Sequence, residues 1–392
     1  MKYSFMIMKK EKEIISKNQG NKNKINELDF LRAFAIFAVI LIHTVAKIDQ
    51  IKSLNSLVFV NVFIDVASHF AVPVFIIISG IVLSYNYYEH INYKSYYIKR
   101  FFSIIPQFLF FSLYYLILSN LILDQRSPSI LKLIYQIFTG RASYHLWFFI
   151  ILIQFYIVYP LLIKLYIIFS SKHRLRTFII MSFLIQILYY VISNYLYTDY
   201  DQILLRLFDY YIRHAFLSYI FYFVIGIHFG RNLDSMKNYI NSANDKRVIF
   251  WLILSNIFVY LIRIKRMETP GYEIDKLSLL PSEIIEPLQY TLSFILLWKI
   301  ASILLERNDL IVSLLKDIGR FSFGIYLIHV FFIIVLVRIL EPFNITFSDW
   351  IFYPIIFFFV SILSYLACKI ISYIPFSYYI IGVRSSKKEE SI

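Results

Sequence analysis

Long apolar blocks alternate with short polar connections along most of the chain. Ten blocks approach or exceed the roughly 20 residues that a helix needs to cross about 30 Å of hydrocarbon. Backbone groups in lipid must be satisfied within each segment, and the period-two polarity of barrel strands is missing, so the pattern predicts helices. The blocks lie at residues 28–48, 60–84, 101–123, 147–169, 177–197, 214–230, 248–264, 285–305, 323–340 and 351–374, the sixth and seventh being the shortest.

This pattern predicts an all-α polytopic membrane protein with about ten transmembrane helices. Residues 28–374 form the membrane domain, between a basic tail at 1–27 and a C-terminal tail at 375–392. The first tail is not followed by the short apolar core of a cleaved signal peptide, so we expect it to be retained. The pattern shows no internal repeat and no appended soluble domain.

The composition supports a membrane class and excludes several others. Hydrophobic residues make up 59% of the 392 residues and charged residues 16%, against about 25% charged residues in soluble proteins. A soluble enzyme, a disordered chain and a nucleic-acid binder are therefore poor interpretations, despite the net charge of +14. A single cysteine, Cys368, excludes a disulfide framework.

The basic residues predict the orientation in the membrane. With the N-terminus inside, the cytoplasmic segments hold 23 Lys and Arg residues and the outer segments 12. Cytoplasmic loops retain such residues, so both termini are expected in the cytoplasm and the protein in the plasma membrane. One cluster opposes the trend, because Arg263, Lys265 and Arg266 fall on the outer side.

Ionisable residues inside a span are costly and mark candidate chemistry. The first block contains Asp29, Arg32 and His43. The 11-residue separation of Arg32 and His43 is about 20° beyond three full turns, so they share one helix face, about 16 Å apart along the axis. Asp29 precedes Arg32 by three residues and can pair with it.

Two interpretations of these residues are open. In the structural one, Asp29 and Arg32 are an ion pair at the membrane entry and His43 is an interfacial histidine. In the functional one, Arg32 binds phosphate as a planar, permanently charged fork, and a neutral His43 removes a hydroxyl proton. The shared face and the apolar wall between the two residues favour the functional interpretation.

Several stretches together resemble one family. Leu31-Arg32 through Ile42-His43 matches the arginine-x10-histidine motif of the acyltransferase 3 family of integral membrane O-acyltransferases. The stretches 71–80, with Pro73, Phe75 and Ser79-Gly80, and 145–160, with His145-Leu146-Trp147-Phe148, Tyr156 and Pro160, look like its second and fourth helices. The stretch 323–329, which contains Tyr326 and ends at His329, resembles the penultimate helix of the family. The chain is similar to stand-alone members of the intercellular-adhesin, surface-polysaccharide type.

The resemblance implies transfer of an acyl group, usually acetyl from acetyl-CoA, to a carbohydrate hydroxyl. No cofactor would be bound permanently, since acyl-CoA is a substrate. In this scheme the CoA phosphates engage Arg32, Lys99 and Arg100, and His43 acts as general base or carries the acyl group briefly. The partners would be acyl-CoA, a glycan acceptor, the bilayer and the polysaccharide-synthesis machinery, with no nucleic acid.

One departure from the family weakens the phosphate clamp. Members often carry basic residues ending in Arg-Ile-x-Pro at the third helix, whereas this chain has Ser103 in place of the last arginine. Lys99 and Arg100 remain, and they also suit a plain topology anchor at the headgroups.

The other candidate residues have structural interpretations beside the functional one. Ser79 with Gly80 suits close helix packing, and Trp147 suits an interfacial belt. Asp29, Ser79, His145, Trp147, Tyr326 and His329 are retained as candidates for lining the substrate site. The histidines follow no metal-binding spacing, so no metal is expected.

Two other functions are open. A polysaccharide or lipid-linked sugar exporter without acyl transfer would also be a basic ten-helix protein, although no broken-helix repeat or phosphate-binding loop is present. A sensor without chemistry is the other, and the geometry of Arg32 and His43 argues against it.

Overall fold

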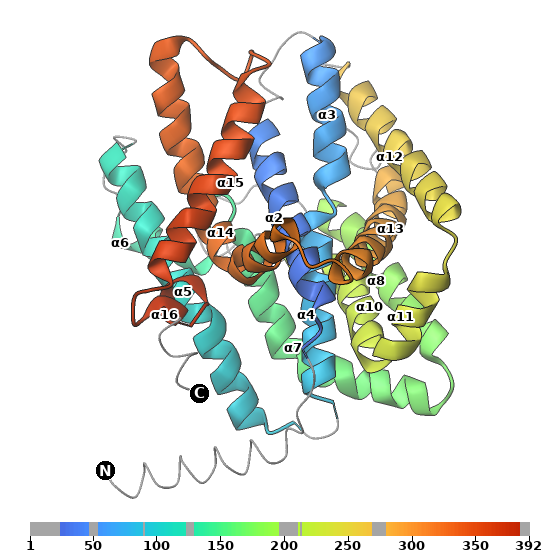
Figure 1. The fold of residues 1–392 in the computed structure, drawn as a ribbon. Helices are drawn as coiled ribbons and strands as arrows, with labels where there is room; N and C mark the ends of the chain where they lie inside the picture. The colour runs from blue at the N-terminus through green and yellow to red at the C-terminus, as the bar shows by residue number, and fades with distance from the viewer. Residues whose placement is uncertain are drawn as a thin grey trace, which may run out of the picture.

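The computed structural model describes residues 24–46, 54–88, 91–122, 129–195, 211, 214–268 and 280–384. Within these ranges the chain forms helices and no strand (Figure 1). The long helices are α2 (Glu27–Val45), α3 (Ser56–Ser68), α4 (Ala71–Asn86), α5 (Tyr93–Ile122), α7 (Trp147–Ser171), α8 (Leu175–Tyr195), α10 (Ile220–Arg231), α12 (Asp245–Met267), α13 (Leu280–Leu305), α14 (Leu310–Leu340) and α15 (Phe352–Ile371). The short ones are α6 (Ile130–Phe138), η2 (Phe216–Tyr219), α11 (Leu233–Ser242), η4 (Glu341–Phe343) and α16 (Ser377–Ile381).

The expected all-α polytopic fold is confirmed. Nine segments of the described chain are long and apolar enough to cross a membrane, and the sixth predicted span corresponds to a shorter apolar helix, Phe216–Arg231. Most of the basic tail, residues 385–392, and the predicted span ends at 48, 123 and 196–197 lie outside the described residues.

The outer helices keep large apolar side chains exposed. Leu188 of α8 is 58% exposed, and Phe250 of α12 and Phe358 of α15 are each 60% exposed. Helix faces with so many exposed large apolar side chains would cause aggregation in water. Lipid tails are their natural solvent, so these helices form the perimeter of the membrane domain.

The second predicted span is divided into two helices. α3 ends at Ser68 and α4 begins at Ala71. Pro73 has no N–H to donate to the carbonyl oxygen of His69, four residues earlier, so one helical hydrogen bond is missing at this turn. His69 Nδ1 hydrogen-bonds to the backbone oxygen of Asp65 at 2.7 Å. The break brings His69 to the wall of a cavity described below.

Helix α2 is at the centre of the bundle (Figure 1). It packs against α3, α4, α13, α14 and α15. Its small residues Ala33, Ala35 and Ala38 are buried, and small residues allow helix backbones to approach in membranes. The helix that carries Arg32 and His43 is therefore held on several sides.

Glycine makes two close helix crossings possible. A Cβ on Gly80 of α4 would lie 2.6 Å from the backbone oxygen of Phe223 in α10, as expected from the Ser79-Gly80 pattern. A Cβ on Gly319 of α14 would lie 1.8 Å from the backbone oxygen of Asp29. The second crossing fixes α14 against the first turn of α2.

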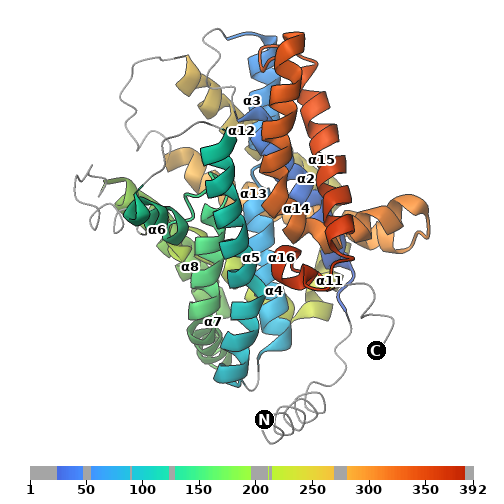
Figure 2. The same cartoon turned by 90° about the vertical axis from the view of Figure 1, so that its left-hand side faces the viewer.

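The chain folds back after α15. The side chain of Gln107 in α5 donates to the backbone oxygen of Tyr378 in α16 at 2.6 Å, and α16 lies against α5 and α14 (Figure 2). Ser377 and Ile381 are buried. The first residues of the predicted C-terminal tail therefore pack onto the membrane domain.

Candidate active site

Arg32 is held at the beginning of α2 by its own helix. Its Nη1 lies 3.1 Å from Asp29 Oδ1, and Asp29 Oδ2 also accepts an ion pair from Lys24 at 2.6 Å. The pairing of residues three apart follows the helical repeat, as the sequence predicts. Asp29 does not line either of the two cavities described next. We therefore assign it as the ion-pair partner of Arg32.

The first cavity, which we call the inner chamber, has a volume of about 240 Å³ and contains two guanidinium groups. Arg100 lies over the rings of Tyr87 and Tyr156, 5.7 and 5.5 Å from their centroids. Its Nε is buried with no hydrogen-bond partner in the described part of the chain. The polar lining consists of Arg32, Ser79, Arg100, Ser103, Tyr156, Ser322 and Tyr326.

The second cavity, the outer chamber, has a volume of about 410 Å³ and contains His43. Its aromatic wall includes Trp147 stacked on Tyr219, with ring centroids 6.3 Å apart. The other polar and aromatic lining residues are His69, Gln186, Tyr190, Ser218, Tyr222, Arg263, Glu283, Glu286, Tyr290 and Tyr326.

Three histidines meet beside the outer chamber. The His43 ring lies 5.1 Å from that of His329 and 6.4 Å from that of His145, and the latter two are 5.1 Å apart. His329 Nδ1 is 2.7 Å from the backbone oxygen of Tyr326. A carbonyl can only accept, so Nδ1 carries the hydrogen and Nε2 keeps a lone pair. That Nε2 is buried without a partner among the described residues.

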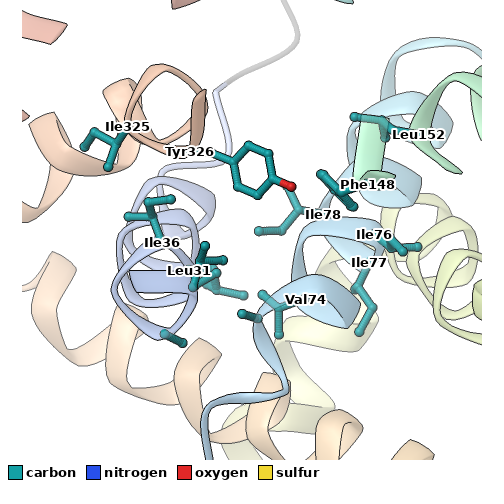
Figure 3. Close-up of a cluster of buried hydrophobic side chains, with 14 of the residues drawn as sticks. Leu31, Ile36, Val74, Ile76, Ile77, Ile78, Phe148, Leu152, Ile325 and Tyr326 are labelled. Atoms are coloured by element: carbon teal, nitrogen blue, oxygen red, sulfur yellow. The ribbon is translucent and has the colours of Figure 1, made fainter. Parts of the chain in front are cut away.

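Tyr326 borders both chambers. Figure 3 shows its ring between Ile36 of α2 on one side and Phe148 of α7 on the other, with Ile78 of α4 nearby. The hydroxyl donates to the backbone oxygen of His145. Phe148 and Ile78 also line the inner chamber. A ligand that reached from Arg32 to His43 would therefore pass Tyr326.

The structure brings most of the predicted residues to these chambers. Arg32, Arg100 and Ser79 line the inner one, His43 and Trp147 line the outer one, and Tyr326 lines both. His145 and His329 are buried against His43. Lys99 does not line either chamber, although its neighbour Arg100 lines the inner one. Ser79 Oγ donates to Phe75 of its own helix at 2.9 Å.

Four ionisable residues of the outer chamber were missed from the sequence. Arg263 was counted with a basic cluster at the outer end of a predicted span, Glu283 and Glu286 stand at the edge of the next span, and His69 was not among the candidates. A pair of glutamates three residues apart at the beginning of an apolar helix was the available signal, because charges at membrane depth are rarely without function.

Comparison with known proteins fits this arrangement. The acyltransferase 3 family, described as an acyltransferase domain, matches residues 25–369. The chain belongs to this family. The predicted resemblance and the assignment as a multi-pass membrane protein are confirmed. No solved structure matches the chain.

Similar curated proteins carry names that mention export. A probable poly-beta-1,6-N-acetyl-D-glucosamine export protein of Staphylococcus aureus (strain MSSA476) is 25% identical over 313 residues, which are 77% of this chain and 81% of that protein. A protein of the same name from Staphylococcus epidermidis is 24% identical over 317 residues, 79% of this chain and 81% of that one. The names of these relatives refer to a polysaccharide.

Proposed function

We propose that this membrane acyltransferase transfers an acyl group from acyl-CoA to a hydroxyl of a surface or exported polysaccharide. The observation that carries the proposal is the meeting of two chambers at Tyr326, one containing Arg32 and Arg100 and the other His43. A donor with phosphates at one end and a reactive thioester at the other suits such a pair of chambers.

The inner chamber is the site for the donor. Two guanidinium groups bind phosphate oxygens with charge-assisted hydrogen bonds, and the unpartnered Nε of Arg100 is available for one of them. The pantetheine arm then extends past Tyr326 toward His43. An apolar lining that includes Phe75, Ile78 and Phe148 keeps water from the thioester. Acetyl is the acyl group that the family habitually transfers.

His43 is the general base in this scheme. Its imidazole takes the proton of the acceptor hydroxyl, and the oxygen forms a bond to the thioester carbonyl carbon. The bond from that carbon to sulfur then breaks, and the imidazolium gives its proton to the departing thiolate. His329, with its ring 5.1 Å from that of His43, positions the base. A brief acyl-histidine at His43 is an alternative route for the same transfer.

The acceptor is inferred from the relatives. Their printed names specify poly-beta-1,6-N-acetyl-D-glucosamine, a polymer rich in hydroxyl groups, and we extend that polymer class to this chain. The enzyme would work beside the machinery that synthesises and exports the polymer in the plasma membrane.

A matched pair of histidine substitutions tests the proposal. His43→Asn removes the base from the outer chamber, whereas His173→Asn changes an exposed histidine in a connection and suits its left-handed backbone. We expect acyl content of extracted polysaccharide to fall at least a hundredfold in His43→Asn, since general base catalysis contributes about 10²–10⁴, and to stay normal in His173→Asn. Normal acylation in His43→Asn at equal membrane expression would reject the proposal.

Export without chemistry is the second candidate, favoured by the names of the relatives. Cells that express the His43→Asn or the His173→Asn variant distinguish the two functions when the amount of polymer outside the cell is measured together with its acyl content. Acyl transfer predicts that His43→Asn cells still export the polymer without acyl groups. Loss of export with unchanged acylation of the residual polymer would favour the exporter.

A further inference from the structure

We infer that Glu283 and Glu286 form an acceptor-binding subsite that selects a glycan unit without negative charge. The identity of the occupant rests on the proposed acyl transfer. Both glutamates line the outer chamber together with His43, but they stand on α13, whereas the residues assigned to the acyl-transfer step stand on α2 and α14. They belong to the recognition of the acceptor rather than to its reaction.

The two carboxylates come from adjacent turns of one helix. Both stand in the first two turns of α13 (Leu280–Leu305), three residues apart, and therefore on neighbouring positions of one face. The hydroxyl of Tyr190 lies near Glu283 and that of Tyr290 near Glu286. A carboxylate has about four acceptor positions, so each glutamate retains positions for hydroxyl or amide donors of a ligand.

The nearby arginine is shared among three acidic residues. Arg263 Nη1 lies 3.7 Å from Asp65 Oδ2, and the Asp65 carboxylate also lies 3.4 Å from His69 Nδ1. Arg263 therefore faces Asp65, which lies outside the lining of the chamber, as well as Glu283 and Glu286. Within the described chain, this one arginine stands against three acidic side chains, two of them in the wall of the outer chamber. The chamber is consequently a poor site for an anion.

Aromatic residues supply the other half of a sugar-binding surface. Trp147 stacks on Tyr219, and Tyr222 lies 6.1 Å from Tyr290, ring centroid to ring centroid. Aromatic side chains offer a large apolar face with a polar edge, which suits the C–H faces of a pyranose ring while its hydroxyls reach the carboxylates. A cavity of about 410 Å³ is in the size range of small-molecule sites.

Charge selectivity follows from this arrangement. A negative charge placed against a pair of buried acidic side chains is disfavoured, whereas a neutral hydroxyl or amide is a good partner. A glycan unit with hydroxyl and N-acetyl groups should therefore bind, and the same unit with a carboxylate should be rejected.

Binding of two probes to the full chain tests the inference without acyl transfer. The probes are a β-1,6-linked N-acetylglucosamine pentamer and the same pentamer with its terminal C6 hydroxyl oxidised to a carboxylate. Titration calorimetry is performed on detergent-purified protein that carries His43→Asn. We expect the neutral pentamer to bind at least about tenfold more tightly, and Glu283→Gln with Glu286→Gln to reduce that ratio below about threefold. A tenfold ratio corresponds to about 1.4 kcal/mol.

Glu306→Gln is the matched control, since Glu306 is exposed just beyond the other end of α13 and should leave the ratio unchanged. A reduction of affinity for both probes alike would be a structural effect, so an unchanged ratio in the double variant overturns the inference. Equal binding of the two probes to the parent protein, or binding of neither, also overturns it. Because no acyl transfer is needed, charge selectivity without transfer by the wild type would leave this subsite standing and reject the proposed reaction.

Discussion

The inner and outer chambers meet at Tyr326 but differ in polarity. The inner chamber is smaller, about 240 Å³, and its charged residues are the arginines Arg32 and Arg100. The outer one, about 410 Å³, combines His43 with aromatic rings and with Glu283 and Glu286. One chamber therefore suits an anionic ligand and the other a hydroxylated ligand without charge. Substitutions in the inner chamber should therefore change the binding of the donor, and substitutions in the outer chamber the binding of the acceptor.

Loss of Arg32 tests the inner half of this comparison most strongly. Arg32→Gln removes a charge-assisted bond to phosphate worth about 1.5–3 kcal/mol, so we expect the KM for acetyl-CoA to rise tenfold or more while the KM for the acceptor stays constant. Asp29 keeps its ion pair with Lys24, which protects the fold. Lys99→Gln is the control, because Lys99 lines neither chamber. A larger effect of Lys99→Gln than of Arg32→Gln would contradict the assignment.

Gly80→Ala should damage both chambers together. The added Cβ would lie 2.6 Å from the backbone oxygen of Phe223, so α4 and α10 must separate, at a cost of about 1–3 kcal/mol. We expect a lower midpoint in thermal unfolding of the detergent-solubilised protein. Ser79→Ala, which removes only a hydroxyl bonded within α4, should leave the midpoint close to that of the wild type. An unchanged midpoint in Gly80→Ala would show that the two helices are less tightly packed.

Ser103→Arg should strengthen the inner chamber. Ser103 stands where the family often has an arginine, and its side chain lines the chamber beside Arg100. An added guanidinium can contact phosphate, so we expect the KM for acetyl-CoA to fall by about threefold, equivalent to about 0.7 kcal/mol. Ser171→Arg adds the same charge at an exposed position and should have no effect. An increased KM in Ser103→Arg would argue against phosphate binding there.

Tyr326, which borders both chambers, should have a modest effect on the reaction rate. Tyr326→Phe removes the hydroxyl that donates to His145, and Tyr115→Phe removes one that donates to Leu327 at 2.8 Å. Each removes a buried hydrogen bond to a backbone oxygen, so similar losses of stability of about 0.5–1.5 kcal/mol are expected. We expect kcat to fall a further two- to fivefold in Tyr326→Phe, since Tyr115 lines neither chamber. Equal kcat values in the two variants would remove Tyr326 from the site.

Local periodicity explains what could be read from the sequence. Lipid requires continuous helices, so the apolar blocks located the spans, and the 3.6-residue repeat located Asp29, Arg32 and His43 on α2. The length criterion could not find α6, α11 or α16, which are too short to cross a membrane. It also could not foresee the break between α3 and α4. Reading prolines as helix terminators would not have located it, since Pro106, Pro160 and Pro287 lie inside continuous helices.

Tertiary packing explains what could not be read. The outer chamber joins His43 of α2 with Arg263 of α12 and with Glu283 of α13, and no local pattern connects residues more than 200 positions apart. In the same way, Lys99 and Arg100 look equivalent in the sequence. Only the packing of α5 against α7 turns Arg100 to the inner chamber.

Transfer across a sealed membrane tests the central claim most directly. Purified protein in proteoliposomes receives labelled acetyl-CoA and the N-acetylglucosamine pentamer, either on opposite sides of the bilayer or both outside. With the N-terminus in the cytoplasm, Arg32 lies near the cytoplasmic end of α2 and His43 toward its outer end, so the donor and the acceptor should enter from opposite sides. We therefore expect label on the pentamer only when the two substrates are on opposite sides, and none in His43→Asn vesicles. Transfer of equal extent with both substrates outside, or transfer by His43→Asn, would contradict the account.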